Sequence, residues 1–415
     1  MNTSTEIKID RLIVKPIAYI LNLFVRLAGK LLKIDHSLNK KFKTLAISKY
    51  KGMGSIIQAT PLIQSLRKNY PEAKIIFITT QTNEELLKKI KCIDEIIVLN
   101  DRNSFILVKS LPSFILKIIS KKIDIYYDLE IYSNISTLIS ALSMAKNRFG
   151  FYLRSSDYRL GIYTHMMFYN VKSPIYQTYL QFARLSIAEE NIVTDILSIK
   201  STDSLKPSSK IIENIKSKKY IVINPNASDL RIERRWDAQK FSDLIKRISE
   251  KYPSLEIILI GNKNEKKYVD EIINSVNNKS VISLAGETSV EELIAIIENA
   301  EILITNDTGP LHLAFATKTK VVALFGPCSP AQYANIDRCS VIYKNVYCSP
   351  CVHEFISPPC NGNNICMKLI KVDEVFDAFI KCKENIFQAP VKNDNEIIYK
   401  AESENNTYIL GRVIN

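Results

Sequence analysis

Two neighbouring stretches decide the fold of this chain, Thr305-Asn-Asp-Thr-Gly-Pro-Leu-His-Leu-Ala314 and Lys320-Val-Val-Ala-Leu-Phe-Gly-Pro327. An apolar strand runs into Asn, Asp and Thr, which are helix-capping residue types, and Pro310 suits the first helical turn. The free N–H groups and dipole of such a helix start can hold a phosphate, and Gly309 lets a ligand approach the backbone. The second strand ends in Gly-Pro, so a second loop opens at the same sheet edge, where α/β sheets bind ligands. The simpler alternative is an ordinary capped helix between two buried strands.

The stretch from Thr305 to Pro330 resembles the nucleotide-sugar signature of glycosyltransferase family 9, the lipopolysaccharide heptosyltransferases. Ala-Phe-Ala-Thr-Lys-Thr-Lys replaces the usual Ala-rich segment, and Cys328 takes the common Thr position. The resemblance covers about residues 44–375 and is strongest in the C-terminal half. It implies an inverting, metal-independent glycosyltransferase. By family analogy, such an enzyme moves heptose from ADP-heptose onto a lipopolysaccharide core or a related surface glycan.

Composition limits the other function classes. The chain has 415 residues, enough for two domains, and its formal net charge is +13. Lys and Arg are scattered, without the tight basic block or interleaved aromatic residues of a nucleic-acid binder, so no nucleic-acid partner is expected. The charge is compatible with an anionic membrane surface, with a phosphorylated substrate, or with genome composition alone.

Residues 1–42 are expected to be a helical segment, with an amphipathic basic helix over about Leu12–Ile34. The N-terminus opens with polar residues, which is not typical of a secretory signal. The apolar segment Leu12–Ile34 is interrupted by charges and a proline, so an interfacial helix fits better than a membrane span. We therefore expect a cytoplasmic protein, peripheral at the inner face of the cytoplasmic membrane. The alternative is that the apolar face packs on the protein's own core or on a second subunit.

Short apolar runs alternate with helical patterns along most of the chain, which indicates an α/β fold with parallel sheets. The rhythm breaks after about Tyr152 and restarts near residue 220. We expect a GT-B type architecture, in which two Rossmann-like domains face a cleft, with the N-terminal amphipathic helix added. The expected parts are the helix at 1–42, an acceptor domain at 43–205, a donor domain at 206–388 and a tail at 389–415. Two short segments of the tail, Glu396–Lys400 and Thr407–Val413, are expected to pair as a hairpin.

The resemblance implies a set of donor-binding residues in the C-terminal half. Residues 307–312 match family positions around the diphosphate and ribose, and residues 224–228 end a strand near the phosphate. Arg234 stands where the family commonly has a phosphate-neutralising Lys. Glu265 resembles the acidic position near the ribose or adenine, although a solvated surface Glu is an equal alternative. The donor candidates are Asn226, Ser228, Arg234, Glu265, Asp307, Thr308, Gly309 and His312.

The acceptor half departs from the family at the expected catalytic base. Residues 51–61 resemble the family's opening motif, but Ser55 stands where the family has its Asp. A Ser hydroxyl is a poor base unless another group activates it. Three alternatives remain: the base has moved, Ser55 only binds donor or acceptor, or the protein is a non-catalytic nucleotide-sugar-binding homologue. Lys51 and Gly54 of this loop are candidates for holding a donor or acceptor phosphate.

Replacement carboxylates follow a later strand. Asp128 and Glu130 both end a strand that faces the expected cleft. The resemblance ranks Glu130 first as the base and Asp128 second, because Glu130 occupies a place where the family often has Gln or His. The alternative is that either carboxylate caps the following helix.

The chain contains no Asp-x-Asp pair, so no cofactor is expected to be required for catalysis. Four cysteines at metal-like spacing, Cys348, Cys351, Cys360 and Cys366, predict a structural zinc site, with His353 as a further ligand. The alternatives are an iron–sulfur cluster, buried free thiols, or a disulfide, which a cytosolic location disfavours.

Overall fold

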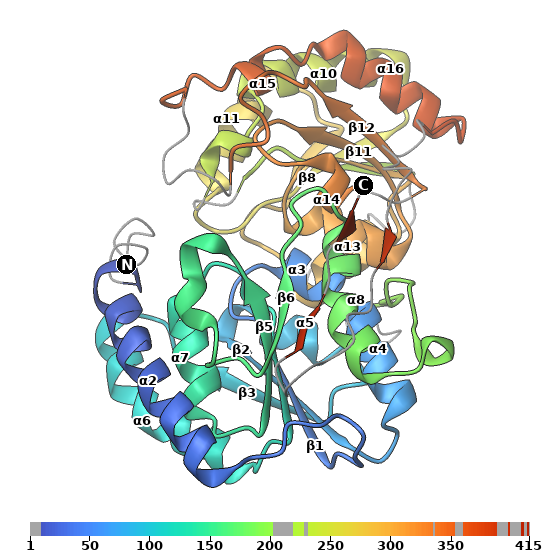
Figure 1. Cartoon of the computed structure of the whole chain (residues 1–415). Coiled ribbons are helices and arrows are strands. Elements are labelled where there is room, and N and C mark those ends of the chain that lie inside the picture. Colours follow the sequence, from blue (N-terminus) through green and yellow to red (C-terminus); the bar gives the residue numbers. More distant parts are fainter. Residues whose placement is uncertain are drawn as a thin grey trace. The chain divides into compact units, whose positions relative to one another are not determined.

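The computed structural model describes residues 10–201, 219–227, 231–334, 337–352, 360–387, 397–398, 408–410 and 413–414. The chain divides into two compact units. Unit 1 comprises Met1–Leu197 with Asp394–Asn415, and unit 2 comprises Ser198–Asn393. Each unit is built on one parallel sheet, so both have the predicted Rossmann-like organisation (Figure 1).

Seven parallel strands form the sheet of unit 1, in the spatial order β14-β6-β5-β4-β1-β2-β3. Their Ile, Leu, Phe and Tyr side chains are largely buried, as expected for a parallel sheet that helices cover on both faces. The strands are β1 (Thr44–Ser48), β2 (Lys74–Thr80), β3 (Glu95–Leu99), β4 (Ile125–Asp128), β5 (Asn147–Tyr152), β6 (His165–Phe168) and β14 (Tyr408–Leu410).

Helices cover both faces of this sheet. Figure 1 shows α2, α6 and α7 along one flank of unit 1 and α4 and α8 along the other; α2 and α6 both pack on α7. The longer helices are α2 (Lys15–Leu32), α4 (Thr60–Asn69), α6 (Ser104–Ser120), α7 (Asn134–Leu142) and α8 (Ile175–Ser186). The shorter elements are the π-helical turn Asp10–Val14, α3 (Met53–Gln58), α5 (Glu84–Leu87) and the 3-10 turns Gln81–Asn83, Arg154–Arg159 and Glu189–Asn191.

Six parallel strands form the sheet of unit 2, in the order β12-β11-β10-β7-β8-β9. They are β7 (Tyr220–Asn224), β8 (Glu256–Leu259), β9 (Val281–Ser283), β10 (Ile302–Asn306), β11 (Lys320–Phe325) and β12 (Cys339–Tyr343). One layer of helices contains α10 (Ala238–Lys251), α11 (Lys266–Val276) and α16 (Val372–Lys383), and α12 (Val290–Glu298) packs with α13 (Gly309–Thr317). Short helices complete the unit: the 3-10 turn Ile232–Arg234, α14 (Pro330–Tyr333) and α15 (Ile365–Lys368).

The structure differs from the sequence-based prediction in two places. Strand β6 lies where the alternation was expected to break. In the tail, Ile397–Ile398 (β13) pairs antiparallel with Val413–Ile414 (β15), but Tyr408–Leu410 pairs with β6 instead of completing a hairpin. The backbone of this tail strand therefore extends the unit 1 sheet, which segment length and polarity alone did not indicate.

Candidate functional site

The predicted donor loops of unit 2 meet at one edge of its sheet. Strand β10 pairs with β7 and with β11, and Thr305 lies beside Asn224 while Asn306 lies beside Leu324. The carboxyl ends of these three parallel strands therefore lie next to each other, where an open α/β sheet binds its ligand.

Two asparagines tie these loops together. The Asn306 amide donates to the carbonyl oxygens of Pro225 and Asn226, both at 3.0 Å, and its Oδ1 accepts from the Trp236 N–H at 3.2 Å. The Asn224 amide donates to the hydroxyls of Thr305 at 2.9 Å and Thr308 at 2.7 Å. Because both amides are buried, the loops are held rigidly at the start of α13.

Arg234 and Asp307 form a charged pair at this edge. The Arg234 Nη1 lies 3.5 Å from Asp307 Oδ2 and donates to the Asp307 carbonyl oxygen at 3.2 Å. Burial opposes the charge on Arg234, but Cys328 and Asp307 raise its pKa, so the guanidinium remains charged. Cys328 is itself buried beside the pair, and burial raises the pKa of its thiol far above the usual value. The guanidinium therefore keeps its positive charge within the pair that it forms with Asp307.

Helix α13 begins at this pair. Its N-cap, Thr308, makes no side-chain capping bond, and Pro310 lies in the first turn. The Thr308 side chain does not cap the first turn, in which Pro310 has no N–H and the Leu311 N–H donates to the Thr308 carbonyl oxygen at 3.1 Å. The Gly309 backbone and the positive end of the helix dipole can still attract a phosphate. His312 follows within this turn and is 5% exposed. Burial lowers its pKa to about 4, Asp307 opposes the shift and Arg234 reinforces it, so the ring is neutral near pH 7.

The other donor candidates lie around the end of β8. The Asn226 amide donates to the Ile260 carbonyl oxygen at 2.9 Å, while its buried Oδ1 has no hydrogen-bond partner within the described chain. Glu265 is half-buried and accepts from the Asn262 N–H at 2.8 Å. A Cβ atom on Gly261 would come within 2.7 Å of the Asn226 amide, so this close approach requires a glycine. Ser228 lies outside the described residues.

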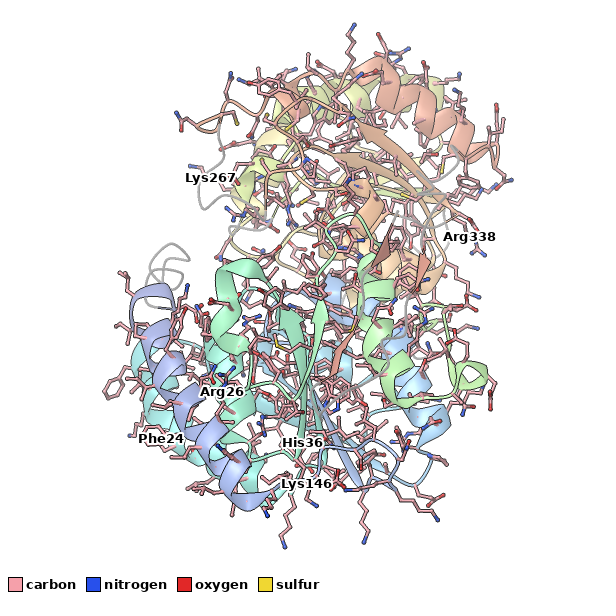
Figure 2. All side chains as sticks on the ribbon, viewed as in Figure 1. Phe24, Arg26, His36, Lys146, Lys267 and Arg338 are labelled. Carbon is pink, nitrogen blue, oxygen red and sulfur yellow. The ribbon has the colours of Figure 1, made fainter. Side chains whose placement is uncertain are left out.

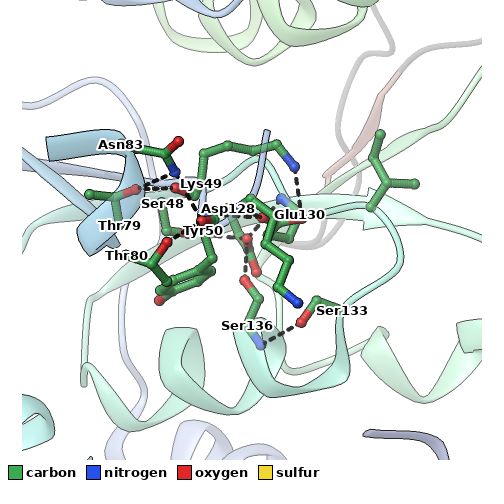
Figure 3. A network of polar contacts seen from close by, with 12 residues as sticks. Ser48, Lys49, Tyr50, Thr79, Thr80, Asn83, Asp128, Glu130, Ser133 and Ser136 are labelled. Atoms are coloured by element: carbon green, nitrogen blue, oxygen red, sulfur yellow. Dashed lines mark hydrogen bonds and ion pairs between the residues drawn. The ribbon is translucent and has the colours of Figure 1, made fainter. Parts of the chain in front are cut away.

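In unit 1, Glu130 holds the loop that follows β1 (Figure 3). Its Oε2 lies 2.8 Å from the Lys49 Nζ, and its Oε1 accepts from the N–H groups of Tyr50 at 2.8 Å and Lys51 at 3.2 Å. Burial alone would raise the pKa of Glu130, but Lys49 and these hydrogen bonds lower it below the usual value. The carboxylate is therefore ionised at neutral pH.

The opposite side of the same loop is clamped by the end of β2. The hydroxyls of Thr79 and Thr80 donate to the carbonyl oxygens of Lys49 at 2.7 Å and Tyr50 at 2.6 Å, and the Asn83 amide donates to the Tyr50 carbonyl at 2.9 Å. Figure 3 shows these side chains on one side of the loop and Glu130 on the other. The loop backbone is therefore fixed from both sides.

Asp128 is more deeply enclosed than Glu130. Its oxygens accept from the hydroxyls of Ser48, Ser136 and Tyr163 and from the Glu130 N–H, and its exposed fraction is 0% against 9% for Glu130. Burial raises its pKa and outweighs the hydrogen bonds that lower it. In these contacts Asp128 fixes Glu130 and its neighbouring elements, and does not face solvent.

The three candidates in the opening motif lie at the start of α3. Gly54 is buried and Ser55 half-buried in its first turn, after Gly52, whose φ of +90° favours glycine. Burial raises the pKa of the Tyr179 phenol, nearby Glu130 raises it further, and the Ser55 hydroxyl opposes the shift. Lys51 is exposed and follows the loop that Glu130 holds.

Sequence reasoning missed the residues that arrange these candidates. Lys49 and Tyr179 in unit 1, and Asn224 and Asn306 in unit 2, were not singled out for these roles. A lone Lys at a strand end carries no signal until its partner, 81 positions later, is brought beside it. Asn224 and Asn306 each end a buried strand, and this position was the one feature of the sequence that could have indicated their role.

The four cysteines of the predicted metal site lie near one another. Burial raises the pKa of Cys351 to about 11, and the thiols of Cys366, Cys348 and Cys360 reinforce the shift. The Cys351 N–H donates to the Pro327 carbonyl at 2.9 Å, so this segment packs on the loop after β11. Within the described parts of the chain, no three His, Cys, Asp or Glu residues are arranged to hold a metal ion, and His353 lies outside those parts.

Comparisons with known proteins agree with this architecture. The sequence model of glycosyltransferase family 9 (heptosyltransferase) matches residues 116–358. Lipopolysaccharide heptosyltransferase 3 of Escherichia coli (strain K12) is 27% identical over 281 residues, which are 66% of this chain and 79% of that protein.

Solved structures share the fold. The E. coli ADP-heptose lps heptosyltransferase II has a TM-score of 0.63 at 18% identity, covering 82% of this chain and 98% of its own. The iron-containing dodecameric glycosyltransferase TibC of enterotoxigenic E. coli H10407 has a TM-score of 0.52 at 12% identity, covering 84% and 77%. Since the family match spans more than half of the sequence, this chain belongs to glycosyltransferase family 9, the heptosyltransferase family, and is a glycosyltransferase.

Proposed function

We propose that this protein transfers heptose from ADP-heptose onto a lipopolysaccharide core or a related surface glycan, with inversion and without a catalytic metal. The observation that carries the proposal is the Arg234–Asp307 pair at the start of α13. The names of the relatives, which are lipopolysaccharide heptosyltransferases, support the sugar and the acceptor class.

In this proposal unit 2 holds the donor and stabilises the leaving diphosphate. The positive end of the α13 dipole and the Arg234 guanidinium supply positive potential where charge develops as the sugar leaves. Thr308, Gly309 and neutral His312 line that helix start, and Asp307 orients Arg234. In this proposal these groups take the place of a metal ion at the leaving diphosphate, and Asn226 and Glu265 are assigned to the nucleoside side.

We assign the catalytic base to Glu130. A carboxylate offers about four lone-pair sites, and the described hydrogen bonds occupy two on Oε1 and one on Oε2. The remaining Oε2 position can take the proton of an acceptor hydroxyl, and ionisation of Glu130 makes it competent to do so. Asp128 is the second choice because it is fully enclosed. Ser55, with Lys51 and Gly54, is assigned to binding acceptor or donor.

The acceptor class also suggests where the enzyme works. A lipopolysaccharide core is linked to lipid, so we propose a cytoplasmic enzyme peripheral to the inner face of the cytoplasmic membrane. The net charge of +13 supports an anionic partner surface.

The first test is ADP release. Purified protein is incubated with ADP-heptose, with and without a lipopolysaccharide-core acceptor, and ADP is measured by mass spectrometry. We expect acceptor-dependent release that Arg234→Ala abolishes. If no acceptor supports release while calorimetry still detects ADP binding, the alternative of a non-catalytic nucleotide-sugar-binding homologue replaces the proposal.

We also propose that Cys348, Cys351, Cys360 and Cys366 bind a structural metal. Four thiols are a donor set suited to zinc or iron, and the structural neighbour TibC is named as iron-containing. Binding requires the sulfur atoms to close in from the described positions, since these form no metal-binding group. Elemental analysis of purified protein should find about one metal per chain. The doubly substituted Cys351→Ser/Cys366→Ser protein should lose it, and a metal-free wild-type protein contradicts the proposal.

A further inference from the structure

Helix α2 is attached to the rest of unit 1 by small and polar side chains, together with Leu21 and Val25, which pack on a small apolar cluster. Ala18, Asn22, Val25 and Gly29 recur at a spacing of four, three and four, which places them in one row along the helix. Ala18 and Asn22 are buried in this row, and the Asn22 amide donates to the carbonyl oxygens of Tyr158 and, at 2.8 Å, Leu160.

Charged and hydroxyl groups beside this row also point to unit 1. Arg26 donates to the Leu160 carbonyl at 2.9 Å, Lys15 to the Ser155 carbonyl at 3.1 Å, and the Tyr19 hydroxyl to Asp157 at 3.2 Å. A Cβ atom on Gly161, whose φ is +97°, would collide with Arg26, so the Arg26 side chain lies flat on this glycine. At the N-terminal end, Asp10 accepts from the first N–H groups of α7. These bonds fix α2 along the surface of unit 1.

The apolar row of α2 consequently faces away from the protein. Ile20, Phe24, Leu27 and Leu31 share the same four, three, four spacing on the opposite side. Figure 2 shows Phe24 projecting outward and Arg26 directed toward unit 1. The large apolar side chains that α2 leaves between 48% and 72% exposed are Ile17, Tyr19, Ile20, Leu23, Phe24, Leu27, Leu31 and Leu32. Helix α2 buries the Asn22 side chain and exposes most of its leucines, which is the reverse of the usual arrangement of a helix that faces water.

Helix α6 adds to the same flank. It packs on α7, as α2 does, and its Phe105, Val108 and Leu116 are exposed. Figure 1 shows both helices along one side of unit 1. The exposed apolar surface therefore extends beyond a single helix.

The charges around this surface are basic. Between residues 10 and 43 the only carboxylates are Asp10 and Asp35. The first caps α7 and the second pairs with Lys40, so neither opposes an anionic partner. Lys30, Lys33 and Lys41 are exposed along the same segment. Apolar side chains flanked by lysines are the pattern of a helix that lies in the interface of an anionic bilayer.

We propose that the outward faces of α2 and α6 form a membrane-docking surface that inserts into the interface of an anionic lipid bilayer. The helix stretch Leu12–Leu32 is long and apolar enough to cross a membrane. Crossing would remove Asn22, Arg26 and Lys15 from their partners on unit 1, so the hydrogen bonds favour an orientation in the membrane plane. This inference does not depend on the transfer reaction.

The test is co-sedimentation of the full chain with vesicles of phosphatidylcholine, with or without phosphatidylglycerol. We expect binding that is stronger to the anionic vesicles and weaker at high salt. Phe24→Glu/Leu27→Glu should lower partitioning by about tenfold or more, since each side chain loses its burial in the interface. The matched control, Leu369→Glu/Ile386→Glu, exchanges two exposed apolar residues of unit 2 and should bind like the wild type.

Three outcomes overturn the proposal. If the Phe24→Glu/Leu27→Glu variant binds vesicles as strongly as the wild type does, this surface does not dock on membranes. A second outcome is that neither protein binds vesicles, while the wild type forms a concentration-dependent oligomer that the variant does not form. The surface then binds a second copy of the chain. Resistance of the cell-membrane-bound protein to alkaline carbonate extraction identifies a spanning helix. The Phe24→Glu/Leu27→Glu variant should bind ADP in calorimetry as the wild type does. This control distinguishes a loss of membrane docking from a failure of the proposed transfer function.

Discussion

Replacing Glu130 by Gln tests whether this carboxylate is the base or only holds the loop after β1. Glu130 and Lys49 form an ion pair of 2.8 Å in which the side chains are 11% and 9% exposed. Gln preserves the size of the side chain, but it removes the counter-charge of the ammonium. Its carbonyl oxygen can still accept from the N–H groups of Tyr50 and Lys51, but its NH2 group then faces the Lys49 ammonium as one donor against another.

The Glu130→Gln substitution should lower the stability of the fold, because the ion pair that it breaks is buried. Breaking a buried ion pair by removing one partner costs about 3–5 kcal/mol, because the other charge is stranded. We expect the free energy of unfolding of Glu130→Gln to fall by about that amount. Lys49→Met in the same chain removes the stranded charge, and replacing both partners by neutral residues is often close to neutral. The double variant should therefore recover most of the loss in urea denaturation followed by circular dichroism.

Activity then separates the two roles. If Glu130 is the base, kcat for ADP release falls by about 10²–10⁴-fold in both the single and the double variant, because neither has a carboxylate to take the proton. If Glu130 only positions the loop, the double variant regains kcat together with stability. A Lys49→Met/Glu130→Gln protein with wild-type kcat refutes the assignment of the base.

Three further predictions concern unit 2. Arg234→Lys keeps the charge but loses the guanidinium fork, so KM for ADP-heptose should rise about tenfold; Arg247→Lys, on the surface of α10, is the control, and equal effects would contradict the assignment. Asn306→Ala leaves three buried backbone groups without partners and should lower the free energy of unfolding by about 2–4 kcal/mol, whereas a loss below about 1 kcal/mol would show that the loops are held otherwise. The pKa of His312 is about 4 in the folded state against 6.5 ordinarily. Its neutral form therefore contributes stability that is complete above pH 6.5 and is lost as the pH falls toward 4. In His312→Gln, the free energy of unfolding measured in urea should lose the part of its pH dependence that lies between pH 4 and 6.5. The same pH dependence in the variant and the wild type would refute this prediction.

The sequence predicted the strands and helices well where apolar runs were long. Residues 300–325 indicated strand, helix and strand, and β10, α13 and β11 lie there. Strand β6, of four residues, was missed, and the tail segment that contains the three-residue β14 was predicted with the wrong pairing partner. Segments this short are strands only because a neighbouring strand offers hydrogen-bonding partners, and that neighbour is fixed by tertiary structure.

The candidate site was predicted unevenly for a similar reason. Residues contiguous in the chain, such as Asp307, Thr308 and Gly309, are brought together by local geometry alone. The contacts of Glu130 come from Lys49 and from the N–H groups of Tyr50 and Lys51, about 80 positions earlier. Backbone donors have no residue type, so no sequence pattern could indicate that this carboxylate carries three hydrogen bonds and a lowered pKa.

Because the proposed base lies in unit 1 and the proposed diphosphate site in unit 2, the two variants should affect different measurements. Glu130→Gln should leave the Kd for ADP unchanged and lower kcat, whereas Arg234→Lys should weaken ADP binding in the absence of any acceptor. Ser55→Ala completes the comparison: if Ser55 only binds, its loss raises KM and spares kcat. A fall in kcat from Ser55→Ala as large as that from Glu130→Gln would mean that the hydroxyl takes part in proton transfer. The Ser55 hydroxyl beside the Tyr179 phenol, which lies near Glu130, would then be the path to examine.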